Sequence, residues 1–371
     1  MRSLPSIVVA GIAISFGPAS SLAFLPSPKS VRLPTISSSR KVEGPSPSSC
    51  VNPIATISSA TRPTSTTLDA VAPEVLTSFI SPAMGFVKSE WTVSYGYGFG
   101  TAISALSLLS KQGRPLQPTV ATLHAAALIF YGFRLNAFLF IRNRMSPTYR
   151  EIGEMIEKKS QERYATRISR APFILSCGLL YYGLYLPVLL TSKLASDGVA
   201  VKSAAGPGLT ALKVLVGMQW FGYLVAALGD LTKSYVKASE KRGKFLVTSG
   251  IFSVVRHPNF SGEILSWTCN ALCGALSAGY LLRSKFSLPV VGYLGLSTIG
   301  WSGIVFVLLG ATKNLENRQQ KEHGDTEKYK EWVKSSWCGW KLPEPKKSES
   351  EEETHEITMN ADVEEGFGSG I

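Results

Sequence analysis

The stretch SGIFSVVRHPNFSGEILSW, residues 249–267, decides the fold because it joins a dense set of polar residues to an apolar run. Pro258 has no backbone N–H, and its ring biases the preceding His257 away from helical angles. A helix is therefore predicted to begin at Pro258, with its unpaired N–H groups close to Arg256 and His257.

The predicted helix carries three chemically informative side chains on one face. Asn259, Glu263 and Trp267 follow one another at intervals of four residues, so they line the same side of a helix. Gly262 lets another backbone or a flat ligand approach closely. The run stays apolar to about Leu282, which is long enough to cross a bilayer. An acid such as Glu263 is costly one turn inside a membrane, which makes it a candidate functional residue.

Five further apolar runs give the chain six predicted membrane spans. Each run has about the 20 residues that a helix needs to cross hydrocarbon, and neither strand alternation nor an internal repeat is visible. The sequence therefore predicts an all-α, polytopic integral membrane helix bundle with about six transmembrane helices. The predicted spans are residues 91–110, 119–141, 171–191, 209–231, 258–282 and 288–311.

Basic residues gather in two of the connections between these spans and in the segment after the last span. The formal net charge of +12 suggests either nucleic acid or an anionic membrane surface as a partner. Segments 142–170, 233–256 and 313–341 hold most of the Lys and Arg residues of the body. In a six-span chain they fall on one face, as the positive-inside rule expects. Membrane lipids are therefore the predicted partner, and nucleic acid is not. An anionic cofactor would meet the Arg-His-Pro stretch on this face.

The stretch at 249–267 resembles the C-terminal domain of the steroid 5-alpha-reductase family, in the bacterial-type branch with an Arg-His-Pro-Asn-x-x-Gly-Glu motif. The resemblance covers roughly residues 119–343 and implies a reductase-like membrane domain over 91–343. A looser Arg-His-Pro motif also occurs in isoprenylcysteine methyltransferases and related membrane proteins. The matching residues are Gly250, Phe252, Arg256, His257, Pro258, Asn259, Phe260, Gly262 and Glu263.

The resemblance implies a site for a nicotinamide dinucleotide, NADPH. In the family an Asp ahead of the motif contacts the cofactor together with the Asn and Glu, and Asp230, Asn259 and Glu263 match by order and approximate spacing. Carboxylates accept hydrogen bonds from ribose hydroxyls, whereas phosphates need cations. In the alternative interpretation Asp230 is a solvated helix end and the lysines are ordinary interfacial residues. The candidate phosphate partners are Arg142, Arg144, Lys233, Lys237, Lys244, Arg256 and His257.

Tyr131 and Arg134 stand three residues apart near the end of the second predicted span, so they share a helix face. The family carries Tyr-x-x-Arg in the corresponding helix, which implies that Tyr131, helped by Arg134, polarises a substrate carbonyl. A phenol suits this role because it donates a hydrogen bond where negative charge develops. Alternatively, Tyr131 packs and Arg134 snorkels. The family's steroid-reducing members also use a Glu on an earlier helix. Glu90 precedes the first span in a different context, so the proton donor is unassigned.

The two ends of the chain differ in composition from the apolar body. Residues 1–23 resemble a signal peptide, with Arg2 before a short apolar run and small residues near Ala23. Residues 24–90 are predicted to be a transit peptide or disordered segment rich in Ser, Thr and Pro. Together they indicate a plastid membrane, with the endoplasmic reticulum membrane as the alternative. Residues 344–371 are acidic and are predicted to form a disordered tail.

The sequence thus predicts a membrane oxidoreductase that transfers a hydride from NADPH to a polarised C=C bond of a lipophilic substrate. Steroid-, isoprenoid- and fatty-acyl-like substrates all suit this prediction. The alternatives are an S-adenosylmethionine-dependent membrane methyltransferase and a non-catalytic membrane scaffold. No metal site is expected, because Cys269 and Cys273 lie one helical turn apart without a neighbouring His.

Overall fold

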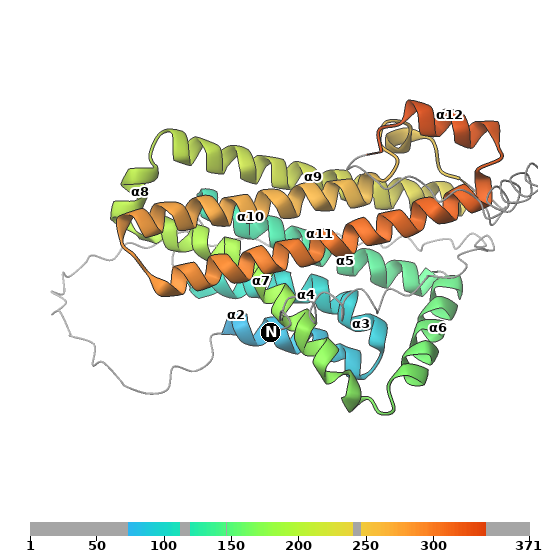
Figure 1. The fold of residues 1–371 in the computed structure, drawn as a ribbon, viewed down its shortest axis with the longest axis horizontal. Helices are drawn as coiled ribbons and strands as arrows, with labels where there is room; N and C mark the ends of the chain where they lie inside the picture. Colours follow the sequence, from blue (N-terminus) through green and yellow to red (C-terminus); the bar gives the residue numbers. More distant parts are fainter. Residues whose placement is uncertain (1–72, 112–118, 146, 240–245, 339–371) are drawn as a thin grey trace, which may run out of the picture.

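The computed structural model describes residues 73–111, 119–145, 147–239 and 246–338 (Figure 1). No strand occurs in these ranges, and one isolated β-bridge joins Val255 to Trp337. The predicted signal peptide and acidic tail lie outside the described residues. The elements are α2 (Pro73–Ile80), η1 (Ser81–Phe86), α3 (Ser89–Val93), α4 (Tyr95–Lys111), α5 (Val120–Met145), α6 (Pro147–Arg163), η2 (Ile168–Arg170), α7 (Ala171–Ser196), α8 (Gly198–Ala204), α9 (Pro207–Ser239), η3 (Gly250–Ser253), α10 (Pro258–Ser284), α11 (Leu288–His323) and α12 (Glu327–Ser335).

The prediction of an all-α membrane bundle is confirmed. Among the described residues, four helices are long and apolar enough to cross a membrane: α5, α7 with the preceding η2, α9 and α11. Helices also lie at the other two predicted positions. However, α4 has only 17 residues, and the 27-residue α10 carries Asn259, Glu263 and Asn270. Length and composition therefore support an integral membrane protein with four such helices, and do not by themselves establish six.

The outer faces of these helices suit contact with lipid. Phe140 of α5, Phe221 of α9 and Phe306 of α11 are all exposed on the surface of the bundle. In water this exposure would be unfavourable, because burying a large apolar side chain lowers the free energy. Exposed apolar surface of this kind on apolar helices indicates that membrane lipids cover it.

Helices α9 and α10 pack unusually closely along their length (Figure 1). A Cβ atom on Gly262 would collide with the carbonyl oxygen of Gly222 and would lie 2.7 Å from the backbone nitrogen of Ala226. One on Gly229 would lie 2.9 Å from the backbone nitrogen of Asn259. Small residues let membrane helices approach backbone to backbone in this way. The close approach places the polar face of α10 directly against α9.

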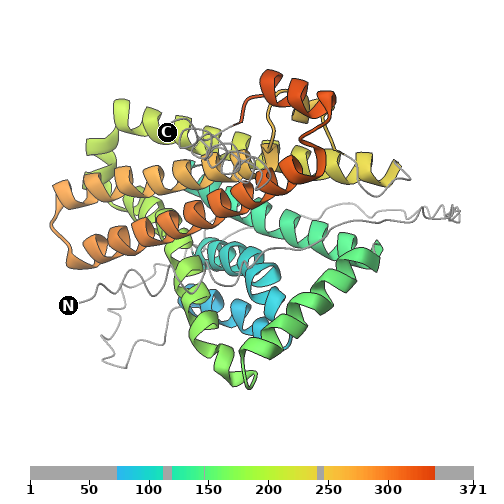
Figure 2. The same cartoon turned by 45° about the vertical axis from the view of Figure 1, so that its right-hand side comes forward.

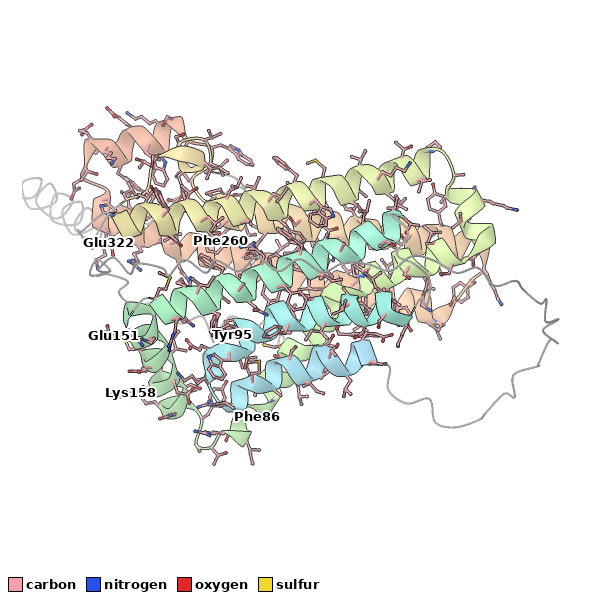
Figure 3. All side chains as sticks on the ribbon, turned by 180° about the vertical axis from the view of Figure 1, so that it is seen from behind. Phe86, Tyr95, Glu151, Lys158, Phe260 and Glu322 are labelled. Carbon is pink, nitrogen blue, oxygen red and sulfur yellow. The ribbon has the colours of Figure 1, made fainter. Side chains whose placement is uncertain are left out.

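The two ends of the bundle carry different connections. Helices α6 and α12 lie near the end at which α5 finishes and α10 begins, whereas α8 and the α10–α11 turn lie at the other end (Figures 1 and 2). Seen from behind, Glu151 and Lys158 project from α6 near the same end as Glu322 of α11 (Figure 3). The described parts of the three predicted basic segments therefore lie at this end, which we call the basic end.

The structure corrects the predicted boundary of the N-terminal segment 24–90. Residues 73–90 form α2, η1 and the start of α3, and they pack on the bundle. The Oγ atoms of Ser78 in α2 and Ser104 in α4 lie 3.0 Å apart, and Lys111 Nζ forms a 2.6 Å ion pair with Glu74. Helix α2 belongs to the folded domain because its polar side chains contact those of α4. The rest of that segment lies outside the described residues.

Candidate functional site

The site is built where α5, α9 and α10 meet. Tyr131 of α5 is fully buried and donates a 2.8 Å hydrogen bond from Oη to Glu263 Oε2 of α10. Its ring stacks on Tyr223 of α9 with ring centroids 4.5 Å apart, and it meets Trp267 of α10 edge-on at 5.4 Å. Tyr97 of α4 closes the cluster, edge-on to Tyr131 at 5.6 Å. The phenol is therefore held by four aromatic and acidic neighbours from three other helices.

One turn towards the basic end, Arg134 of α5 pairs with Asp230 of α9. Arg134 Nη1 donates to Asp230 Oδ2 at 2.6 Å, and both side chains are 16% exposed. The guanidinium also lies over the Tyr131 ring, 5.6 Å from its centroid. Lys233 and Arg142 interact electrostatically with the Asp230 carboxylate. The predicted pair Tyr131 and Arg134 thus each engage one of the two predicted acids.

Asn259 lies one helical turn before Glu263, at the start of α10. Its backbone nitrogen faces Gly229, the residue next to Asp230, so it lies on the same side of α10 as the acids. In the described part of the chain its side chain forms no hydrogen bond. Asp230, Asn259 and Glu263, predicted as a set, are therefore brought to one region of the α9–α10 contact.

Arg256 and His257 are engaged by a carboxylate from α11. Glu316 Oε1 lies 2.8 Å from His257 Nε2 and 3.1 Å from Arg256 Nη1. His257 is 1% exposed, so its ring is part of the core. Both residues were predicted to face cofactor phosphates. In the structure both contact Glu316, since a buried charge is stabilised by an opposite charge in contact with it, and their role towards phosphates stays a prediction.

The same carboxylate anchors the C-terminal segment, α12 with residues 336–338, which we call the C-terminal clasp. Trp332 Nε1 donates to the Phe252 carbonyl at 2.6 Å. Val254 and Arg256 exchange backbone hydrogen bonds with Trp337. Burial, and then the nearby Glu316 carboxylate, raise the pKa of Tyr329 in α12 to about 12. The Arg-His-Pro loop is thereby fixed in place at the start of α10.

The five other candidate phosphate partners differ in outcome: Lys233 and Arg142 interact with Asp230, and Lys244 lies outside the described residues. Lys237 belongs to the last turns of α9, and its side chain lies outside what the structure describes. Arg144 is exposed near the end of α5. Arg142, one half-turn earlier, is the arginine that interacts with Asp230.

Sequence reasoning missed the inner wall of the site. Tyr223 and Gln219 lie seven and eleven residues before Asp230 on α9, and both are fully buried. The helical spacing was visible in the sequence, because residues seven and eleven apart share a helix face. Trp267 was already placed on the same helix face as Glu263, whereas its neighbour Tyr97 was not readable from one helix alone, because its position depends on how α4 packs against α10.

Among the described residues, no three His, Cys, Asp or Glu side chains lie close enough together to hold a metal ion. Comparison with curated proteins and with solved structures gives no match. One family model matches residues 84–336, well over half of the 371 residues, and its range includes every site residue described above. The chain therefore belongs to the DUF1295 family, described as a protein of unknown function.

Proposed function

We propose that this protein is an NADPH-dependent membrane oxidoreductase that reduces a polarised C=C bond in a lipophilic substrate. The observation that carries the proposal is the buried hydrogen bond from Tyr131 to Glu263, one turn from the Arg134–Asp230 pair. A phenol positioned by a carboxylate inside an apolar bundle can donate to the oxygen of an enone as negative charge develops there. The resemblance to steroid 5-alpha-reductases supports the same assignment.

The donor set suits a dinucleotide. Asp230, Glu263 and Asn259 offer acceptors for ribose hydroxyls and an amide, while Lys233 and Arg142 bring positive charge for phosphates. The helix α10 has no side-chain hydrogen bond at its N-cap, His257, so its first N–H groups suit a phosphate. NADPH, when bound, supplies the hydride.

The chain's own residues divide the remaining work. Tyr131 has one hydroxyl hydrogen, and Glu263 accepts it. A substrate carbonyl receives that hydrogen only when Glu263 takes another donor, such as a ribose hydroxyl or an amide. Arg134, which is paired with Asp230, lies over the Tyr131 ring. The surrounding aromatic rings exclude water. Activation of the substrate is therefore coupled to occupation of the neighbouring acceptors.

The location of the protein is proposed from its N-terminal composition. A signal-like segment at 1–23, followed by Ser- and Thr-rich residues, supports import into a plastid membrane. A fluorescent fusion at the C-terminus of the full chain tests this, since retention in the endoplasmic reticulum would contradict it.

Titration of the purified full-length protein with NADPH and with S-adenosylmethionine tests the reaction class. Saturable binding of NADPH, followed by its oxidation when a lipophilic enone is added, is the expected result. Binding of S-adenosylmethionine alone would favour methyl transfer. If neither binds and Glu263→Gln behaves as wild type, the protein is a scaffold. Tyr185→Phe is a suitable control because that buried hydroxyl lies on α7, outside the site.

A further inference from the structure

The inner wall of the site contains a group of buried polar atoms that the proposed reaction does not use. We call Gln219, Tyr223 and Trp267 the deep polar cluster. All three side chains are fully buried. Both amide atoms of Gln219, the Tyr223 hydroxyl and Trp267 Nε1 form no hydrogen bond within the described part of the chain. The Gln219 amide lies close to the Tyr223 hydroxyl without reaching hydrogen-bond geometry.

The cluster lies on the side of Tyr131 away from the basic end. Trp267 follows Glu263 by one turn of α10, and Gln219 precedes Tyr223 by one turn of α9. Tyr223 precedes Asp230 by about two turns, or ~10 Å along the helix. Its ring stacks on Tyr131 at 4.5 Å and meets Trp267 at 5.7 Å. The site thus has three successive layers: the Arg134–Asp230 pair, the Tyr131–Glu263 pair and the deep polar cluster.

Leaving such atoms without partners is costly. A buried polar group without a partner loses its hydrogen bonds to water and gains none in return, which destabilises the folded protein. Buried polar atoms without a partner also occur elsewhere among the described residues, as at Thr92 Oγ1 and Tyr185 Oη. A comparable buried polar group is satisfied, however: His124 contacts Thr191 at 3.1 Å and Asn270 at 2.9 Å, and Thr191 also contacts Ser277 at 3.2 Å. The unsatisfied atoms at the site come from two different helices and meet beside the candidate catalytic phenol. The concentration of four such atoms on three neighbouring side chains indicates that a molecule other than the protein supplies their partners.

We propose that the deep polar cluster binds a second, uncharged oxygen group of the substrate, a hydroxyl or a carbonyl, separate from the carbonyl at Tyr131. This inference rests on the proposed function. An amide and a phenol each donate and accept, and an indole N–H donates, so a hydroxyl finds both kinds of partner. None of the three side chains is charged, which favours a neutral group over a carboxylate or an amine. The rings of Tyr223 and Trp267 provide flat apolar contacts for the ring or chain that carries the group.

Two probes test the proposal with the full-length protein in detergent and without cofactor. One is an alkyl-cyclohexenone bearing a ring hydroxyl, and the other is the same molecule without that hydroxyl. Their dissociation constants are measured by thermal shift and tryptophan fluorescence. Wild type is expected to bind the hydroxylated probe about tenfold more tightly, the value of one well-satisfied hydrogen bond. Gln219→Leu and Trp267→Phe are expected to lose the preference, and Tyr185→Phe to keep it.

Stability without a probe gives an independent readout. Gln219→Leu removes two unsatisfied atoms at similar side-chain volume, so it is expected to melt at or above the wild-type temperature. Trp267→Phe also leaves a cavity in the core, so it is expected to melt below the wild-type temperature. Equal binding of the two probes to wild type would overturn the proposal and leave water as the partner of these atoms. So would a hydroxyl preference that survives both substitutions. A preference that is present while NADPH fails to bind would overturn only the proposed function.

Discussion

Tyr131 and Glu263 are 132 positions apart in the sequence, and a 2.8 Å hydrogen bond joins them across the α5–α10 contact. Tyr131 is fully buried, so its hydroxyl is shielded from bulk water. The phenol and the carboxylate therefore act as one unit, because the hydroxyl hydrogen of Tyr131 is donated to one acceptor at a time. This relationship gives the first of four predictions.

Tyr131→Phe is expected to lower kcat for enone reduction by about 10²- to 10⁴-fold, because the hydrogen-bond donor to the developing negative charge is lost. The dissociation constant for NADPH is expected to change less than about threefold, since the acceptors on α9 and α10 remain. Steady-state kinetics and equilibrium titration measure the two effects. Tyr185→Phe is the matched control, and an equal loss in that variant would contradict the assignment.

The Arg134–Asp230 pair is expected to be strongly coupled. Each side chain is 16% exposed, so removing one partner leaves a largely buried charge without compensation. Arg134→Leu and Asp230→Leu should each lower the free energy of unfolding by about 2–4 kcal/mol, and the double variant by less than the sum. The exposed Arg318–Glu322 pair on α11 is the comparison, with an expected coupling of about 0.3–0.5 kcal/mol. Similar coupling energies in the two cycles would be the contrary result.

Gly262→Ala is expected to push α9 and α10 apart, because the new methyl group meets the backbone of Gly222 and Ala226. The cost should be about 1–3 kcal/mol in unfolding free energy, with reduced NADPH binding. Gly279→Ala, on the same helix with nothing within 4 Å of the added carbon, should be neutral or stabilising by up to about 1 kcal/mol. Thermal unfolding of both variants decides this, and equal melting temperatures would show that the helices are not in close contact.

The contacts of α6 with η2 and α3 are expected to weaken in acid. Burial tends to raise the pKa of Glu157, but hydrogen bonds from Arg170, Ser89 and Gln161 lower it below the ordinary value of 4.5. The folded state therefore binds this proton more weakly than the unfolded state. Its stabilising effect is complete above about pH 5 and is lost as the pH falls through the lowered pKa.

Glu157→Gln should consequently cost about 2 kcal/mol near neutral pH and little at pH 3, because the wild-type carboxylate is then protonated. Melting temperatures between pH 7 and pH 3 provide the measurement. Glu154→Gln, at an exposed position of the same helix, is the control. A pH profile that is unchanged by Glu157→Gln would show that this residue does not couple folding to acid.

The helices were predictable where the sequence is apolar over a long run. Pro258 starts α10 as its missing N–H predicts, and helices lie at all six predicted positions. Helices α2, α6 and α12 were missed because they are short or polar. Their positions depend on contacts such as Trp332 with the Phe252 carbonyl, which no local pattern encodes.

The candidate site was predictable in its membership and not in its pairing. Spacing along single helices correctly grouped Tyr131 with Arg134, and the resemblance grouped Asp230 with Glu263. The pairing of Tyr131 with Glu263 and of Arg134 with Asp230 depends on the rotation of α5 against α9 and α10, which the sequence does not show. The roles of Arg256 and His257 remain predictions. Positive charge alone suggested phosphates, whereas the structure supplies Glu316, 59 residues after His257.

The backbone contact between α9 and α10 also limits the routes by which a lipophilic molecule can reach Tyr131. A substrate cannot enter between these two helices while the backbones of Gly222 and Gly262 are in contact. The boundary between α5 and α9 is instead closed by side chains: Phe130 and Trp220 lie 5.2 Å apart, and Trp220 Nε1 donates to the Leu123 carbonyl at 3.1 Å. A lipophilic molecule that entered from the surrounding lipid between α5 and α9 would therefore have to displace the Trp220 side chain.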